Sequence, residues 1–274
     1  MTQYRGELAT SYGLWGYLQW REGRLDEARK NLEISTEMRE GLVREHPNLP
    51  FYWSGVGWSR MRLGQVHRDA GRLAEARANL GRACDALEVA VRINPGDHWS
   101  RNILGIAYSN LGGVLTRLGQ DREALAAYRR AIDHQRRCFE SNTVNEDYRQ
   151  GLSDHYLGLA ALLRKIGRPG EATAAILERQ RLWPANADEL YHSALDLAEC
   201  VPLVGRGRAE LTREERTECR RYADQALDAL RRAIAAGLLA TPSPTTPELD
   251  SPRARDMFPA LVMDAAFPDN PFAR

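Results

Sequence analysis

The chain has 274 residues, of which 43% are hydrophobic and 27% are charged, so it is long enough and apolar enough to bury a core. Its 38 basic and 37 acidic side chains nearly cancel, which argues against the positive field that nucleic acid or an anionic membrane surface would select. We therefore expect no nucleic-acid partner. No apolar run approaches the roughly 18 residues of a membrane helix, and the N-terminus lacks an apolar signal core. These features predict a cytoplasmic protein without a membrane partner.

Side chains that could bind a metal or act as nucleophiles are scattered along the chain. The cysteines, none in a C-x-x-C pair, are Cys84, Cys138, Cys200 and Cys219. The histidines, none at metal-ligand spacing, are His46, His67, His98, His134, His155 and His192. We expect the thiols to be buried or idle in a reducing compartment and the histidines to lie at surface or helix-cap positions. No nucleophile–base pair is visible, so the sequence predicts a non-enzyme without cofactor or metal.

An internal repeat organises the first two hundred residues. The segments GRLDEA, GRLAEA, GQDREA and GRPGEA begin at glycines 23, 71, 119 and 167, a constant spacing of 48 residues. Four further columns share this period: Leu8, Val56, Leu104 and Leu152; Gly16, Gly64, Gly112 and Ala160; Ala28, Ala76, Ala124 and Ala172; and Leu32, Leu80, Tyr128 and Ile176.

The columns predict a pair of antiparallel helices in each repeat. In the first repeat, Tyr4, Leu8, Tyr12 and Trp15 form one stripe of a helix. The repeated glycine ends that helix because it can adopt a left-handed conformation, and the repeated glutamate lies in the first turn of the next helix, where the helix dipole favours it. The small columns mark the place where the two helices press together. The second helices of the first two repeats are expected to end near Pro47 and Pro95.

This hinge resembles the tetratricopeptide repeat, in which a small residue is followed twelve positions later by alanine and then by a large apolar residue. The resemblance implies an all-α, right-handed superhelix of antiparallel helix pairs, an α-solenoid that acts as a protein-binding scaffold. The unit of 48 residues is longer than the standard unit of about 34. Long units of this kind look like the arrays that follow the kinase domain in planctomycete-type bacterial serine/threonine kinases.

We expect three segments along the chain. Residues 1–200 form four long repeats and the first helix of a fifth, residues 201–240 an inserted loop and a long helix that completes the fifth pair, and residues 241–274 a proline-rich connector and a short closing helix. The long helix is expected from about Thr212 to Ala236, with Gly237 as its cap. Its expected buried side consists of Tyr222, Ala226, Leu230, Ala233 and Ile234. The stretch at 249–258 is similar to the ending of the kinase-linked arrays.

The resemblance places a partner in the concave groove formed by the first helices. The groove positions carried over are Tyr17, Trp20, Arg21, Trp58, Met61, Gln65, Arg68, Ser109, Thr116, Arg117, Leu157, Arg164 and Lys165. Aromatic and Arg side chains are typical of peptide-binding hot spots, and the column of Arg21, Arg117 and Lys165 favours an acidic protein or peptide.

Several alternatives remain open from the sequence. The main one, implied by the resemblance, is a regulatory or sensory region of a serine/threonine kinase that is separated from its catalytic domain, since the chain itself has no glycine-rich loop, H-R-D or D-F-G motif. The chain could also be a fragment of a longer kinase or a free-standing adaptor. Its own segment 251–274 could fill the groove. Self-association is a further expectation, because Tyr4, Leu8 and Tyr12 lie at an uncapped end of the array.

Overall fold

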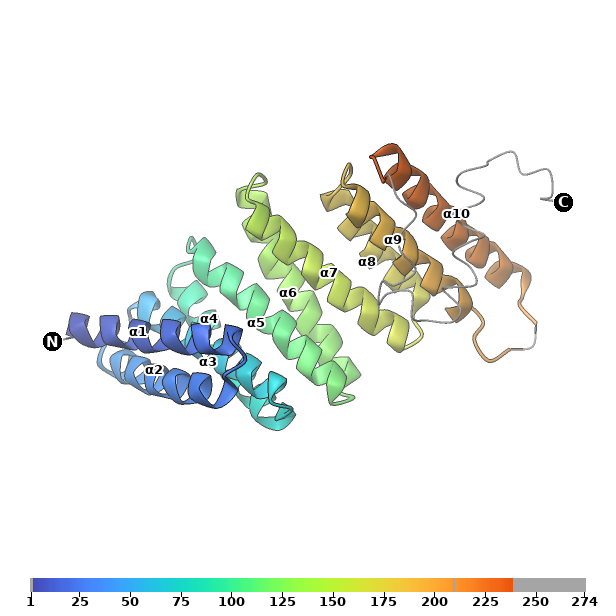
Figure 1. The fold of residues 1–274 in the computed structure, drawn as a ribbon. Coiled ribbons are helices and arrows are strands. Elements are labelled where there is room, and N and C mark those ends of the chain that lie inside the picture. Colours follow the sequence, from blue (N-terminus) through green and yellow to red (C-terminus); the bar gives the residue numbers. More distant parts are fainter. Residues whose placement is uncertain (1, 209, 239–274) are drawn as a thin grey trace. The chain divides into compact units, whose positions relative to one another are not determined.

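A computed structural model describes residues 2–208 and 210–238, and this part of the chain is helical without a β-strand. Ten α-helices and one 3₁₀ helix follow one another along it (Figure 1). In order they are α1 (Thr2–Arg21), α2 (Leu25–Glu45), α3 (Pro50–Asp69), α4 (Leu73–Ile93), α5 (His98–Arg117), α6 (Asp121–Ser141), α7 (Glu146–Lys165), α8 (Pro169–Leu182), α9 (Ala187–Cys200), η1 (Val201–Leu203) and α10 (Arg213–Ala235). The predicted all-α helical-repeat fold is confirmed.

The chain divides into two compact units, Met1–Gly158 and Leu159–Arg274, and the division falls within α7. In the first unit, α1 packs on α2, α3 on α4 and α5 on α6. Successive pairs then join through α2 with α3 and through α4 with α5. Each pair would expose an apolar face if it stood alone, so the stacked neighbours complete one another's cores.

The repeated glycines end the first helix of each pair as predicted. Their φ angles are +78° at Gly23, +75° at Gly71, +73° at Gly119 and +72° at Gly167. In the first repeat the amide of Gly23 donates to the carbonyl of Trp20 and the amide of Arg24 to that of Gln19, each at 2.9 Å. This pair of bonds is the Schellman arrangement, which requires a left-handed residue at the position of the glycine. The same two bonds recur at the other three glycines.

The small columns mark the closest approach of the paired helices. Ala28, Ala76, Ala124 and Ala172 are all fully buried. A Cβ placed on Gly16 would lie 2.8 Å from Leu32 Cγ, and one on Gly64 would lie 2.6 Å from Leu80 Cγ. Both distances are below van der Waals contact, so these columns are small because the neighbouring helix occupies the space that a side chain would need.

In the second unit, α9 packs on α8 and α10 packs on α9. The helix expected from Thr212 is α10, whose first turn carries a capping box formed by Thr212 and Glu215. Two details differ from expectation. The segment expected to be a loop after α9 begins with the 3₁₀ helix η1, and Ile234 is 42% exposed rather than buried, because the packed face of α10 ends at Ala233. The connector and closing helix expected within 241–274 lie outside the described residues.

Two histidines are buried, which corrects the expectation that all six lie at surface or cap positions. His67 is 8% exposed and His155 is 3% exposed. His155 lies beside Gly105 and Gln135, since a Cβ on Gly105 would stand 3.4 Å from its Nε2 atom and 3.1 Å from Gln135 Oε1. Both ring nitrogens of His155 are buried without a hydrogen-bond partner, and this burial lowers the pKa of His155 to about 4.

The buried His155 predicts a loss of stability in mild acid. The unfolded chain binds a proton near pH 6.5, whereas the folded chain keeps His155 neutral down to about pH 4. Lowering the pH through this window therefore favours the unfolded state, by about 2 kcal/mol at pH 5. Urea denaturation followed by circular dichroism at neutral pH and at pH 5 measures the difference. The variant His155→Leu should lose most of it, and a variant of the exposed His98, His98→Gln, should keep it. An equal pH dependence in both variants would contradict the assignment.

Candidate functional site

Three first helices of the first unit lie side by side and share polar contacts. The indole Nε1 of Trp20 on α1 donates to Asp69 Oδ2 on α3 at 2.8 Å. On the other side of α3, Gln65 Nε2 and Arg68 NH1 both donate to Asn110 Oδ1 on α5, at 3.4 and 2.9 Å. We name this surface the α1/α3/α5 face and define it by Tyr17, Trp20, Arg21, Trp58, Arg62, Gln65, Arg68, Asp69, Asn110 and Arg117.

An arginine lies among three aromatic rings at the centre of this face. The guanidinium carbon of Arg62 is 4.4 Å from the ring centroid of Tyr17, 5.4 Å from that of Trp58 and 5.8 Å from that of Trp20. Cation–π contact of this kind stabilises a guanidinium that has lost part of its water. Burial is the main effect that lowers the pKa of Arg62, Tyr17 opposes it, and nearby Arg21 adds to it.

Arg62 has no carboxylate partner within the part of the chain that the structure describes. Its NH1 donates to Gln65 Oε1 at 2.9 Å, and its Nε is buried without a hydrogen-bond acceptor. Buried guanidinium groups are normally paired with carboxylates or fully hydrogen-bonded. The guanidinium of Arg62 is therefore available to form an ion pair with an anionic group.

A second, partly buried guanidinium lies near the same tryptophan. Arg39 on α2 stands 5.9 Å from the Trp58 ring, and it donates to Ser35 Oγ at 3.3 Å and to Thr10 Oγ1 at 3.2 Å. Burial lowers the pKa of Arg39 to about 10. No ion pair to Arg39 occurs among the described side chains, so positive charge accumulates around Trp58 from two helices.

The remaining charges of the α1/α3/α5 face leave it basic. Arg21 is exposed and donates to the Tyr17 hydroxyl at 3.1 Å. Arg68 forms an ion pair of 2.8 Å with Asp69, and Arg117 donates to the backbone carbonyl of Arg68 at 3.4 Å. Burial opposes ionisation of Asp69, but hydrogen bonds from Arg68 and Trp20 outweigh it, and the pKa of Asp69 lies below its ordinary value. The face thus holds four arginines and one carboxylate.

The structure brings together seven of the thirteen groove positions predicted from the sequence. They are Tyr17, Trp20, Arg21, Trp58, Gln65, Arg68 and Arg117, although Gln65 is only 7% exposed. Met61 is fully buried and offers no surface to a partner. Ser109 and Thr116 are partly buried on α5, and Thr116 donates its hydroxyl to the Gly112 carbonyl. Leu157 is 38% exposed on α7.

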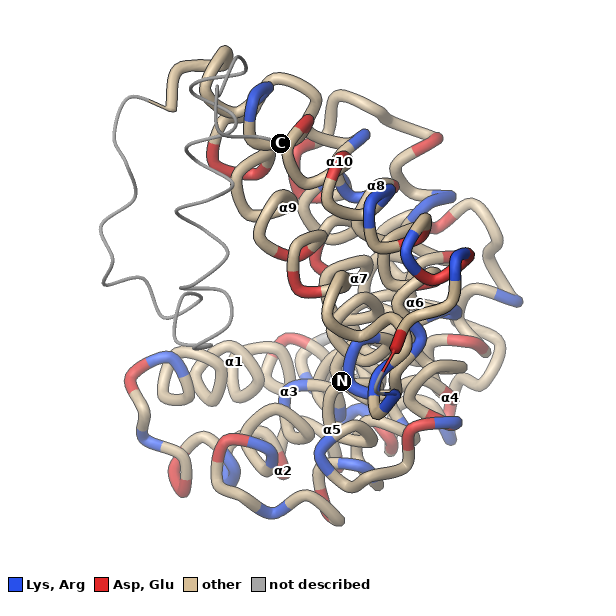
Figure 2. Tube along the Cα trace, turned by 90° about the vertical axis from the view of Figure 1, so that its right-hand side faces the viewer, with Lys and Arg blue, Asp and Glu red and all other residues tan. Residues whose placement is uncertain are grey.

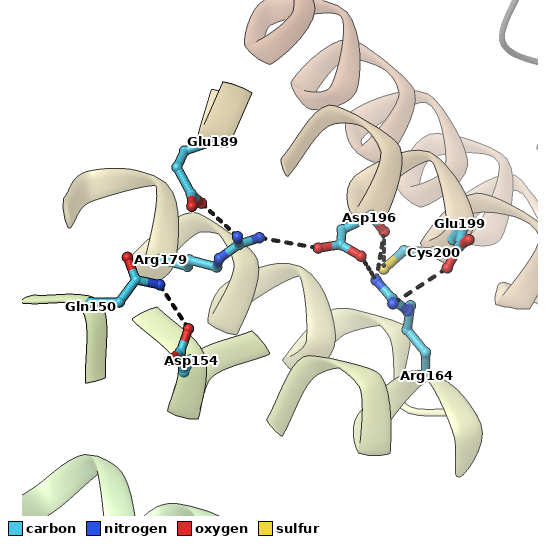
Figure 3. A network of polar contacts seen from close by, with 8 residues as sticks. All are labelled: Gln150, Asp154, Arg164, Arg179, Glu189, Asp196, Glu199 and Cys200. Carbon is cyan, nitrogen blue, oxygen red and sulfur yellow. Dashed lines mark hydrogen bonds and ion pairs between the residues drawn. The ribbon is translucent and has the colours of Figure 1, made fainter. Parts of the chain in front are cut away.

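Arg164 and Lys165 belong to the second unit, where Arg164 is held inside an ion network (Figure 3). Arg164 NH1 lies 2.5 Å from Asp196 Oδ1, and its NH2 lies 3.3 Å from Glu199. Arg179 joins Asp196 at 3.5 Å and also pairs with Glu189. The side chains of Arg164, Asp196 and Arg179 are 16%, 15% and 8% exposed. Arg164 therefore joins α7 to α9, and Arg179 joins α8 to the same carboxylate, so Arg164 presents no free charge and its role differs from the one expected.

Two residues of the site, Arg62 and Arg39, are absent from the groove positions predicted from the sequence. Arg62 follows Met61, one of the predicted groove residues, and the helix places Arg62 rather than Met61 among the rings. Arg39 comes from a second helix, whereas only first-helix columns were used to find the groove. The local charge in the sequence marks neither residue, since basic and acidic positions are interspersed along the helices of each unit (Figure 2).

In the described residues, side-chain placement bears on metal binding and helix composition on membrane insertion. Across 2–208 and 210–238, no group of three His, Cys, Asp or Glu side chains is placed to hold a metal ion. No helix of this part of the chain combines the length and apolar character that a membrane crossing needs. Cys84, Cys138 and Cys200 are buried, as expected, and Cys219 is partly buried. Burial is the main cause that raises the pKa of each of these thiols, which makes them poor nucleophiles.

Comparison with known proteins supports a tetratricopeptide-type fold. The tetratricopeptide repeat family matches residues 105–140, which cover most of α5 and α6. Two crystal structures of the nearly identical TPR-like repeats of a Podosopora anserina kinesin light chain candidate superpose with a TM-score of 0.57. The first is 16% identical and covers 82% of this chain and 95% of its own; the second, a point variant of that protein, is 17% identical and covers 85% and 98%.

A third structure, MamA, is 18% identical, covers 86% of this chain and all of its own, and has a TM-score of 0.47. No curated protein sequence matches this chain. At these identities the two TPR-like structures with a TM-score of 0.57 show the shared helical-repeat fold and nothing about partners.

Proposed function

We propose that this chain, which carries a tetratricopeptide repeat within an all-α array, is a non-catalytic scaffold that binds an acidic protein segment on its α1/α3/α5 face. Tetratricopeptide folds typically mediate protein–protein interaction, and a helical-repeat array presents a long rigid surface for that purpose. The face combines exposed or partly exposed Trp, Tyr and Arg side chains, which dominate the binding energy of protein interfaces.

The observation that carries this proposal is the unpaired guanidinium of Arg62 within its ring of Tyr17, Trp20 and Trp58. Arg62 as a whole is only partly buried and forms no ion pair with the described side chains, and a carboxylate from a partner would supply that pair. A hydrogen bond between charged groups contributes about 1.5–3 kcal/mol. Planar guanidinium groups also bind carboxylates in a bidentate manner, which gives direction as well as affinity. Arg21, Arg68 and Arg117 would extend this attraction along the segment.

Binding to an array of short peptides tests the proposal. The array samples acidic, neutral and basic compositions, and fluorescence polarisation then gives the affinity of the best acidic peptide. We expect the double variant Arg68→Glu with Arg117→Glu to weaken this affinity at least tenfold, which corresponds to about 1.4 kcal/mol or more, because each reversal replaces attraction with repulsion.

The matched control reverses two arginines away from the face. Arg77 and Arg82 are exposed on α4, and the variant Arg77→Glu with Arg82→Glu changes the net charge by the same amount. The control should bind the acidic peptide nearly as well as the parent chain. Equal weakening in the two double variants would show that only net charge matters, and a preference for basic or neutral peptides would contradict the proposal.

A second candidate is a regulatory region of a bacterial serine/threonine kinase system, with catalysis supplied by another polypeptide or domain. The sequence resemblance in the long repeat unit and in residues 249–258 favours it. A kinase reading frame beside the gene would support this candidate, and its absence from related genomes would weigh against it. In either case we propose the repeat-based division at residues 200 and 240 as the domain organisation and the cytoplasm as the site of action.

A further inference from the structure

The outer side of α1 is an apolar stripe on which no described helix packs. Its exposed large side chains are Tyr4 (70%), Leu8 (37%), Leu14 (51%), Trp15 (54%) and Leu18 (50%). The opposite side of the helix, with Ala9, Gly13 and Gly16, is buried against its neighbours. Single exposed apolar residues are ordinary on protein surfaces, but five along about four turns of one helix form a patch of the size that marks interaction sites.

The spacing of this stripe fits the seam between two helices. Tyr4, Leu8, Ser11, Trp15 and Leu18 follow one another at intervals of four and three residues, which is the 3.5-residue period of helices packed as a two-stranded coil. A helix with the same period is the natural partner for such a stripe. Helix α1 of a second copy of the chain has the same sequence and therefore the same period.

We propose that α1 packs antiparallel against α1 of a second copy of the chain, with the two-fold axis at the level of residue 13, so that the two copies of Leu14 lie about 3 Å apart along the helix axis. In this arrangement Leu8 meets Leu18 of the second copy, and Trp15 lies over Ser11 of the second copy. The largest side chain of the stripe thus covers the smallest, which gives dense packing at the seam. A parallel arrangement would place Trp15 against Trp15 and Ser11 against Ser11, and would crowd one layer while leaving a void in the next.

The charged side chains beside the stripe also favour the antiparallel arrangement. Glu7 and Arg21 are exposed, lie on the same edge of the stripe as Leu14, and stand seven residues before and after it. The antiparallel contact therefore brings each Glu7 near Arg21 of the second copy, twice by symmetry, whereas a parallel contact would align like charges. A two-fold contact of one surface with itself also closes the assembly at a dimer.

The area of the stripe predicts a dimer of moderate strength. The five exposed apolar side chains carry on the order of 500 Å² per chain, so two copies would bury about 1,000 Å². This value lies at the lower end for specific interfaces, so we expect monomer and dimer to exchange with concentration. The contact does not depend on peptide binding, and Arg21 is the one residue that it shares with the α1/α3/α5 face.

Sedimentation velocity of the intact chain over a series of concentrations tests the dimer. We expect the mass to rise from monomer to dimer and no further. The variant Trp15→Glu places two carboxylates in the seam and should stay monomeric, while Trp99→Glu, which changes a similarly exposed tryptophan on α5, should dimerise like the parent. Circular dichroism confirms that both variants remain helical. A chain that stays monomeric at every concentration, or a Trp15→Glu variant that still dimerises, would overturn the proposal.

Thiol cross-linking tests the direction of the contact in chains that also carry Cys219→Ser, because the other three cysteines are buried. With a short thiol-to-thiol linker, Leu14→Cys should cross-link to itself. Leu8→Cys should not cross-link to itself, since its copies would lie about 15 Å apart along the helix axis, but it should cross-link when mixed with Leu18→Cys. Efficient self-linking of Leu8→Cys together with failure of the mixed pair would overturn the antiparallel arrangement.

Discussion

Replacing Asp196 by alanine is expected to destabilise the second unit by about 3–5 kcal/mol. Asp196 contacts Arg164 at 2.5 Å and Arg179 at 3.5 Å, and all three side chains are less than one fifth exposed. Removing the shared carboxylate leaves two largely buried guanidinium groups with fewer partners, and the desolvation of those charges is then poorly compensated. Hydrogen exchange of the α8 and α9 amides, together with thermal unfolding, measures the loss.

An exposed ion pair in the same unit provides the control for Asp196→Ala. Asp228 pairs with Arg232 at 3.8 Å on α10, and its side chain is 67% exposed. Exposed pairs one helical turn apart contribute only about 0.3–0.5 kcal/mol, so Asp228→Ala should leave the exchange of α8 and α9 nearly unchanged. If the two variants exchange alike, the network of Arg164, Arg179 and Asp196 contributes little to the stability of this unit.

Replacing Gly64 by leucine should destabilise the first unit by about 3 kcal/mol, the upper end for added bulk in a packed interior. A Cβ at this position would lie 2.6 Å from Leu80 Cγ and 3.3 Å from the carbonyl oxygen of Ala76. Leu80 could adjust its rotamer, but the Ala76 carbonyl belongs to the backbone of α4, so a larger side chain must push α3 and α4 apart. Urea denaturation followed by circular dichroism provides the measurement.

A second glycine in the same helix pair separates crowding from the loss of glycine itself. Gly81 lies within α4, and a Cβ there would meet nothing within 4 Å. Alanine is favoured over glycine in a helix by about 1 kcal/mol, so Gly81→Ala should leave stability unchanged or raise it. A Gly64→Leu chain as stable as the parent would mean that the small column is not required for packing.

The local features of the repeat could be predicted because their causes are local. A glycine that must adopt a left-handed conformation ends a helix whatever surrounds it, and the four hinge glycines do so. The alanine and glycine columns recur because each pair of helices repeats the same close contact. The helix expected from about Thr212 does begin there, because Thr212 and Glu215 form a capping box within four residues.

The composition of the candidate site was predicted less well because it depends on how whole helices pack. The groove positions chosen on α3 were Trp58, Met61, Gln65 and Arg68. α3 is covered by α2 and α4 as well as by α1 and α5, and this rotates its accessible stripe by about one position. Met61 is therefore fully buried, and Arg62 takes its place among the rings of Tyr17, Trp20 and Trp58.

By itself, the sequence determined the helix pairs, their hinges and the period of 48, since these depend on residues within one turn of each other or on repetition that can be counted. Only the tertiary structure decided which charges are used and which remain available. Arg164 and Arg62 look alike in the sequence, yet one lies among carboxylates of α9 and the other among aromatic rings of α1 and α3. The difference arises because the partners of a buried charge come from distant parts of the chain, and their distances are set by packing.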